Sequence, residues 1–146
     1  EPGNKIYLCG VEIPFDRSLS GHSDADVALH SLTDAILGAL ALGDIGLHFP
    51  DTDKQWKNAD SIIFLNWSLK KAKQRNLKLS NIDLTIICEK PKINNFREQL
   101  IANLSKICSL EHDKINVKAT TTERLGFTGR EEGIASMCSV LLYETS

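Results

Sequence analysis

The stretch SGHSDADVALHSLTDAILGALALGD, residues 20–44, decides how this chain can fold. Apolar residues recur in it with helical spacing and Gly43 is a stop signal, so the sequence predicts a helix from Ser23 to about Leu42. Ser23 followed three residues later by Asp26 resembles a capping box at the start of this helix. The predicted helix has one apolar face, which must be buried against the rest of the protein.

Four titratable residues at intervals of four form one stripe along this predicted helix: His22, Asp26, His30 and Asp34. Helix capping explains Asp26 without a functional site. His30 and Asp34 are harder to explain, because neither residue type is favoured mid-helix among alanine, leucine and valine. A satisfied core histidine and a metal-binding imidazole oriented by a carboxylate one turn away are equally good interpretations.

The rest of the chain alternates between strand and helix patterns. Four segments are predicted strands: residues 5–13, with a kink or tight turn at Gly10, then 81–89, 115–121 and 131–144. Two segments have helical spacing, residues 58–76 and 94–110, whereas residues 43–55 are predicted to form a long loop. This order predicts one α+β domain over residues 1–146, with a mixed four-stranded sheet and helices packed on one face.

The composition excludes several classes of partner. Seventeen basic and 19 acidic residues give a net charge of -2, and no basic stripe is interleaved with aromatic residues, so we expect no binding to nucleic acid or anionic membrane. His30 and Asp34 interrupt the longest apolar run, which predicts no membrane span. The four cysteines are widely spaced without a C-x-x-C pair, which favours reduced, mostly buried thiols in an intracellular compartment.

Two loops carry groups suited to a ligand. In GDIGLHFPDTD, residues 43–53, Asp44 could bind hydroxyls, although an ordinary acidic connection explains the segment equally well.

In KATTTERLGFTGR, residues 118–130, hydroxyls, backbone N–H groups and guanidinium groups occur together, as phosphate oxygens require. Glu123 beside them fits a Mg²⁺ that bridges a carboxylate and phosphates. Strand propensity explains only the threonines, so we favour a functional interpretation here. CEKPKI, residues 88–93, taken alone is best read as a simple turn.

Together these segments resemble the 2-C-methyl-D-erythritol 2,4-cyclodiphosphate synthase family of the non-mevalonate (MEP) isoprenoid route. The matching stretches are HSDADVALHSLTDAILGALALGDIG (22–46), FPDTD (49–53), ADS (59–61), PK (91–92) and NVKATTTERLGFTGREEGIA (116–135). The resemblance implies a metal-assisted phosphorus–oxygen lyase. It would convert 4-diphosphocytidyl-2-C-methyl-D-erythritol 2-phosphate to the cyclic diphosphate and CMP, by attack of the 2-phosphate on the β-phosphorus.

The resemblance also implies roles for individual residues. The catalytic groups that stabilise the transition state would be His22 and Thr121. The metal ligands would be His30, for zinc, and Glu123, for Mg²⁺ or Mn²⁺. The contacts with the diphosphate, ribose and methylerythritol parts would come from His22, Ser23, Asp44, Ile45, Gly46, Phe49, Pro50, Asp51, Thr52 and Asp53. The cytosine pocket would be formed by Cys88, Glu89, Lys90, Pro91, Lys92, Ile93 and Asn94. The phosphates would be held by Thr120, Thr121, Thr122 and Glu123, and the positions near the threefold axis of a homotrimer would be Phe127 and Arg130.

The sequence departs from the family at its start. The family's other two zinc ligands belong to an Asp-x-His on a first strand, which lies N-terminal to the point where this sequence begins. Because catalytic zinc normally takes three protein ligands, His30 alone would leave the ion under-coordinated. Helix and phosphate segments keep their full patterns, so we expect a missing N-terminal strand, which would also supply a partner for residues 5–13.

Two other functions remain open from the residues. The incomplete zinc set is also compatible with a trimeric small-ligand binding protein without turnover. The clustered His and Asp residues could serve a metal-dependent phosphohydrolase, which would release inorganic phosphate instead of CMP.

For location, we expect the bacterial cytoplasm or a plastid-type organelle after removal of a transit peptide.

Overall fold

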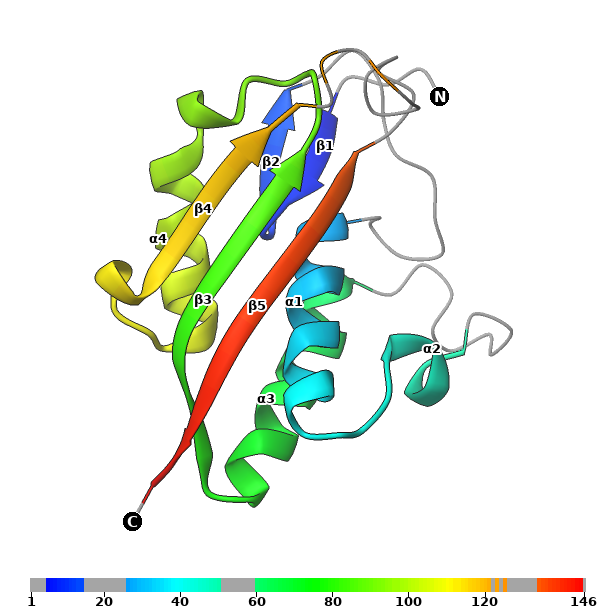
Figure 1. Ribbon diagram of the computed structural model, residues 1–146, viewed down its shortest axis with the longest axis vertical. Helices are drawn as coiled ribbons and strands as arrows, with labels where there is room; N and C mark the ends of the chain where they lie inside the picture. The colour runs from blue at the N-terminus through cyan, green and yellow to red at the C-terminus, as the bar shows by residue number, and fades with distance from the viewer. Residues whose placement is uncertain are drawn as a thin grey trace.

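The computed structural model describes residues 5–14, 26–50, 60–121, 123, 125 and 134–145. Its main sheet has the strand order β4-β3-β5 (Figure 1). The central strand β3 (Leu77–Ile87) pairs in parallel with β4 (Ile115–Thr120) and antiparallel with β5 (Ala135–Glu144). A parallel pair needs a crossover, and here the chain passes through the 3₁₀ turn η2 (Ile93–Asn95), helix α4 (Arg97–Cys108) and the 3₁₀ turn η3 (His112–Lys114).

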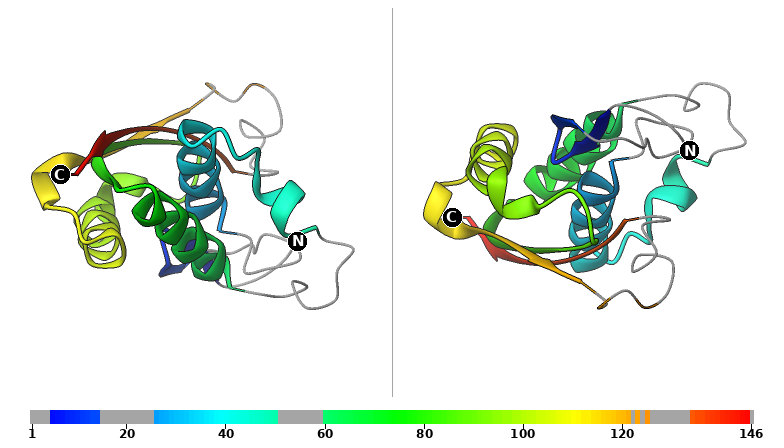
Figure 2. Two further views of the ribbon diagram at one scale, coloured as in Figure 1. Left: turned by 90° about the horizontal axis from the view of Figure 1, so that it is seen from below. Right: turned by 90° about the horizontal axis from the view of Figure 1, so that it is seen from above.

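The helices cover one face of this sheet, as the two end-on views in Figure 2 show. Helix α1 (Val27–Ala39) lies against β5, α4 lies against β4, and α3 (Ser61–Gln74) packs on α1 and reaches the start of β3. The short helix α2 (Ile45–His48) lies beside α1. The prediction of a mixed sheet with helices on one face is confirmed.

The predicted strand over residues 5–13 is instead a hairpin. Strand β1 (Lys5–Leu8) pairs antiparallel with β2 (Val11–Pro14), and this pair forms a separate two-stranded sheet. Cys9 and Gly10 make the turn at φ 55° and 77°, which confirms the tight turn predicted at Gly10. The prediction of four strands in one sheet was therefore wrong for the described residues. The partner of residues 5–8 lies in residues 11–14, within the same segment.

Helix α1 is shorter than predicted at both ends. It begins at Val27 with Asp26 as its N-cap, whereas Ser23 lies outside the described residues. At the other end Ala41 takes the left-handed conformation, and the Leu42 N–H donates to the Leu37 carbonyl at 2.9 Å, which is a Schellman-type ending. The helix therefore stops before Gly43. In the same way Asn76 is left-handed just beyond α3.

The core lies between the sheet and the helices. Leu32 and Ile36 of α1, with Leu84 and Ile86 of β3, are fully buried in it. Each such side chain contributes on the order of 2 kcal/mol to the free energy of unfolding. Among the described residues no helix is long and apolar enough to cross a membrane. The four cysteines are free thiols, buried or half-buried, as predicted.

Candidate functional site

The carboxyl ends of β3 and β4 bring two of the predicted ligand segments together. The strands are in register up to the pair Ile87 and Thr120, and the Cys88 N–H then donates to the Thr120 carbonyl at 3.1 Å. Residues 88–94 and residues 120–123 therefore start side by side at one edge of the sheet. Polar groups after neighbouring parallel strands commonly bind ligands at such an edge.

The segment after β3 is a turn anchored in the core. Cys88 and Ile93 are buried, and the Cys88 thiol donates to the Pro91 carbonyl at 3.7 Å across a cis Lys90–Pro91 peptide bond. Lys90, Lys92 and Asn94 are exposed, while Glu89 and Pro91 are half-buried. Burial raises the pKa of the Cys88 thiol to about 11, so it is protonated at neutral pH and is not a nucleophile. Its role here is to anchor the turn.

The segment after β4 presents hydroxyl and carboxylate groups to solvent. Thr120, Thr121 and Glu123 are exposed. Glu123 has a left-handed backbone at φ 54°, and its N–H donates to the Thr121 Oγ1 at 3.2 Å. Because the Thr121 oxygen already accepts this bond, its O–H remains to donate to an anion.

Helix α1 reaches the same end of the sheet near its N-terminus. Ser31 Oγ lies 2.8 Å from Ser136 Oγ at the start of β5, and Ser136 pairs with Ile86 near the end of β3. His30 precedes Ser31 and is half-buried. The start of the helix is itself fixed by Asp26, whose buried carboxylate accepts from the N–H groups of Leu29, Cys9 and Gly10 at 3.0, 3.0 and 2.7 Å.

The predicted zinc site is not formed by the described residues. Among them, no group of three His, Cys, Asp or Glu side chains is placed to hold a metal ion. Asp34 anchors α2, since its Oδ1 accepts from the Ile45 N–H at 2.9 Å. Glu123, by contrast, suits Mg²⁺, which commonly uses one carboxylate together with the phosphates of a substrate.

The predicted loop over residues 43–55 contains helix α2. Asp44 is its N-cap and accepts from the Leu47 N–H at 2.9 Å, while Ile45 is half-buried and Gly46 is exposed. Phe49 is buried and Pro50 is half-buried. Asp44 is therefore a structural cap as well as a candidate ligand group, because the cap uses its Oδ1.

An aromatic row that the sequence analysis missed connects this segment to α3 and to His30. We use the name aromatic row for His48, Trp67, Phe49, Phe64 and His30. Ring centroids are 4.7 Å apart for His48 and Trp67, 5.1 Å for Trp67 and Phe49, 4.7 Å for Phe49 and Phe64, and 6.0 Å for Phe64 and His30. Phe64 and Trp67 are three residues apart on one helix, which was the available signal.

Several predicted site residues lie outside the described residues: His22, Ser23, Asp51, Thr52, Asp53, Thr122, Phe127 and Arg130. Their assigned roles stay predictions. Those that are described fall into two groups, one at the carboxyl ends of β3 and β4 and the other on α2 and the residues next to it, apart from His30, which lies on α1.

The fold and this edge of the sheet define an α+β protein with a site suited to phosphate groups. The model of the YgbB family matches residues 1–143. The chain belongs to the YgbB family, and the family resemblance seen in its sequence is confirmed.

The curated relatives fall into two kinds. The chain is 53% identical over 143 residues to a 2-C-methyl-D-erythritol 2,4-cyclodiphosphate synthase of Cereibacter sphaeroides (strain ATCC 17029 / ATH 2.4.9), which covers 98% of this chain and 90% of that protein. It is 56% identical over 140 residues to a bifunctional enzyme IspD/IspF of Paracoccus denitrificans (strain Pd 1222), with 96% and 37% covered. The chain thus spans little more than a third of the bifunctional relatives it matches.

Solved structures of related proteins have the same fold as this chain. The bifunctional IspDF from Campylobacter jejuni has a TM-score of 0.94 at 44% identity, covering 100% of this chain and 40% of that one. A CDP complex of IspF from Plasmodium falciparum has a TM-score of 0.87 at 34% identity, covering 98% and 86%. The second shows that a related fold binds a cytidine diphosphate.

Proposed function

We propose that this chain converts 4-diphosphocytidyl-2-C-methyl-D-erythritol 2-phosphate to 2-C-methyl-D-erythritol 2,4-cyclodiphosphate and CMP. The observation that carries the proposal is the hydrogen bond from Cys88 to Thr120, which joins the turn over residues 88–94 to the hydroxyls and carboxylate of residues 120–123. The Cereibacter sphaeroides relative, which the chain covers almost fully, and the CDP complex of a related fold support it.

The reaction needs no protein nucleophile. An oxygen of the 2-phosphate forms a bond to the β-phosphorus, the bond from that phosphorus to the bridging oxygen breaks, and CMP leaves with the electron pair. The attacking group is already anionic and is tethered to its target, so proximity supplies much of the rate. What remains for the protein is to hold both phosphates and to stabilise charge as it develops.

The groups after β4 suit that task. The Thr121 O–H donates to a phosphate oxygen, since its oxygen is already held by the Glu123 N–H. Glu123 would hold Mg²⁺ or Mn²⁺ together with the phosphates, and the ion would neutralise their charge. Thr120 and Thr122 add hydroxyls, and His22 is proposed as a second stabilising group. No step is assigned to zinc, for which His30 is a single candidate ligand.

The remaining contacts position the substrate. The turn over residues 88–94 would hold cytosine, largely through its backbone, because Cys88 and Ile93 fix it to the core. On α2, the second carboxylate oxygen of Asp44 would accept from ribose hydroxyls, with Ile45 and Gly46 beside it. Phe49, Pro50 and residues 51–53 would cover the methylerythritol part.

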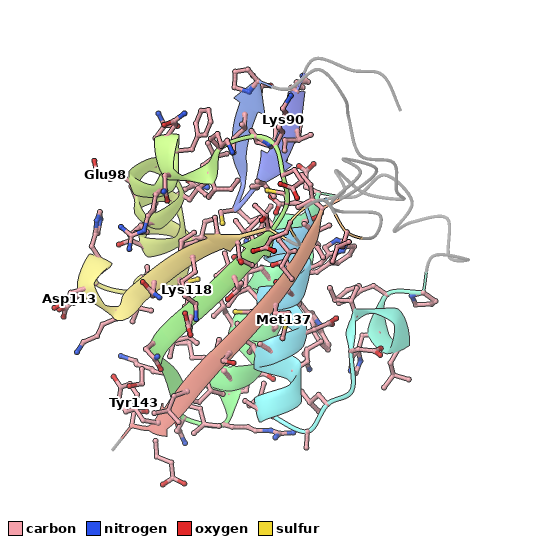
Figure 3. All side chains as sticks on the ribbon, turned by 45° about the horizontal axis from the view of Figure 1, so that its top comes forward. Lys90, Glu98, Asp113, Lys118, Met137 and Tyr143 are labelled. Carbon is pink, nitrogen blue, oxygen red and sulfur yellow. The ribbon has the colours of Figure 1, made fainter. Side chains whose placement is uncertain are left out.

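A homotrimer with sites between subunits is part of the proposal. The sheet face opposite the helices carries Met137 and Tyr143, which are 66% and 49% exposed (Figure 3). Leu141, two residues before Tyr143 on the same strand and therefore on the same face, is 60% exposed. Large apolar side chains exposed on one face suit an interface between copies. Phe127 and Arg130 would lie near the threefold axis. Analytical ultracentrifugation should give three times the mass of one chain, and a monomer would contradict it.

The test is ³¹P NMR of the synthetic substrate with the protein and Mg²⁺, with and without Zn²⁺. We expect the cyclic diphosphate and CMP to appear together. Release of inorganic phosphate instead would indicate a phosphohydrolase, and binding of CDP without turnover would indicate a binding protein.

We also propose a reducing compartment, the bacterial cytoplasm or a plastid-type organelle, in keeping with the free thiols.

A further inference from the structure

Helix α2 has little of its own to hold it in place. It has four residues, none of them buried, and Leu47 is 68% exposed. A single helical turn is not stable alone, since helix nucleation is costly. Its position must therefore come from side chains of neighbouring elements.

Those side chains act at the two ends of α2. At its start, Asp34 accepts from the Ile45 N–H. At its end, His48 lies against Trp67, and its Nε2–H donates to the Leu42 carbonyl. Phe49 follows, buried against the edge of the Trp67 ring at an interplanar angle of 84°. Trp67 thus contacts the last residue of α2 and the residue after it.

Trp67 is not itself one of the proposed ligand groups, although its ring lies against Phe49, which is. It belongs to α3, is half-buried, and carries the Lys71 ammonium 5.1 Å from its ring centroid. Phe64, one turn earlier, lies against both Phe49 and His30, so a change there would affect two candidate site residues at once. Within the described part of the chain, the ring contacts of Trp67 are with His48 and Phe49, both at the end of α2.

We propose that Trp67 is a positioning residue, which fixes the end of α2 through His48 and Phe49 and so sets the affinity of the segment Asp44–Phe49 for the ligand. The proposal rests on the proposed function only in taking that segment as a ligand contact. Aromatic pairs of this kind add to simple burial, and Trp67 takes part in two of them.

The first experiment uses no ligand. In ¹⁵N-labelled protein, amide order parameters of Leu47 and Phe49 should fall from about 0.85 toward 0.6 or below in Trp67→Leu, because the end of α2 loses its ring contacts. Ile63→Ala is the matched control, since Ile63 is exposed on the same helix and outside the aromatic row. His48→Ala removes the partner ring without a change in α3, and the amide order parameters should fall in the same way. This variant keeps the test possible if Trp67→Leu does not fold.

The second experiment measures ligand binding. Trp67→Leu should bind CDP about tenfold more weakly by calorimetry, and Trp67→Phe, which keeps a ring, should stay within about threefold of the parent. In turnover, KM should rise while kcat stays nearly constant, because the groups after β4 are untouched. A residue that only supports the fold would not give this split.

Three results decide the matter. Parent-like order parameters in both Trp67→Leu and His48→Ala would overturn the proposal, and so would parent-like CDP affinity in Trp67→Leu. If the parent protein binds no CDP, the proposed function fails, while the ligand-free order parameters still show whether Trp67 positions α2.

Discussion

The two parts of the proposed site are held in different ways. At the carboxyl ends of β3 and β4, the strand ladder fixes the point where each segment begins, and the Cys88 to Thr120 hydrogen bond continues the ladder by one step. The segment Asp44–Phe49 belongs to no strand and is held by side chains, namely Asp34 at its start and the aromatic row at its end. Substitutions at the first part should change chemistry without moving the backbone, whereas substitutions around the second should change where the backbone lies.

The largest effect on turnover is expected for Glu123, just beyond the carboxyl end of β4. Glu123→Gln removes the carboxylate charge that would hold the divalent ion, so CMP release should fall about a hundredfold or more. The side chain is exposed, so the urea midpoint should hardly change. Glu98→Gln, an exposed acidic position on α4, is the control (Figure 3). Unchanged turnover in Glu123→Gln would remove Glu123 from the site.

Asp26 tests how much stability one side chain provides when it holds two backbone segments together, the start of α1 and the turn of the hairpin. Asp26→Ala leaves the N–H groups of Leu29, Cys9 and Gly10 without their acceptor, and should lower the free energy of unfolding by about 2–4 kcal/mol. Urea denaturation measures this loss. Asp26→Asn keeps an acceptor oxygen and should recover part of it. A loss below about 0.5 kcal/mol would mean that the hairpin and α1 are held by packing alone.

A smaller effect is expected where one bond anchors α2. Asp34→Ala frees the Ile45 N–H, and CDP should bind about fivefold more weakly while kcat is kept. Asp113→Ala, on an exposed position of η3, should bind CDP like the parent. If kcat falls and affinity stays, the comparison between the two parts is wrong, because α2 would then act in the chemical step.

The smallest effect is expected at Cys88. Its pKa is raised to about 11 by burial, so alkylation by iodoacetamide at pH near 7 should be slow and should rise about tenfold per pH unit up to that value. Peptide mass spectrometry follows this one thiol, and urea-unfolded protein gives the reference rate. Fast labelling of the folded protein at neutral pH would show that the turn after β3 opens readily.

Local patterns in the sequence were enough for most elements. Periodicity predicted α1, α3, α4 and the strands of the main sheet, since each has an apolar face of its own. The segment over residues 5–13 was predicted as one strand with a kink or tight turn at Gly10, and the sequence did not show that its two halves pair with each other. The ends of α1 were wrong because Asp26 serves as the cap and Ala41 takes the conformation usually left to glycine.

In the candidate site too, what lies in one continuous segment could be predicted, and what depends on contacts between distant segments could not. Residues 120–123 and 88–94 could be found in sequence because their chemistry lies in continuous motifs. The anchoring of α2 could not, because Asp34 is eleven residues from Ile45 and Trp67 is far along the chain from His48. Spacing along the helix relates Asp34 only to His30, one turn away, and does not predict the bond that the Asp34 carboxylate accepts from the backbone of Ile45.

The contact between Ser31 and Ser136 spans 105 residues of chain and ties α1 to β5. During synthesis, α1 leaves the ribosome long before the strand that will cover it exists. The unit of β3, α4 and β4, by contrast, is complete within one continuous segment and can form early. The side chains of α1 that pack on β5 must therefore stay exposed or be bound by a chaperone until β5 is made, so the nascent chain is most open to aggregation during that interval.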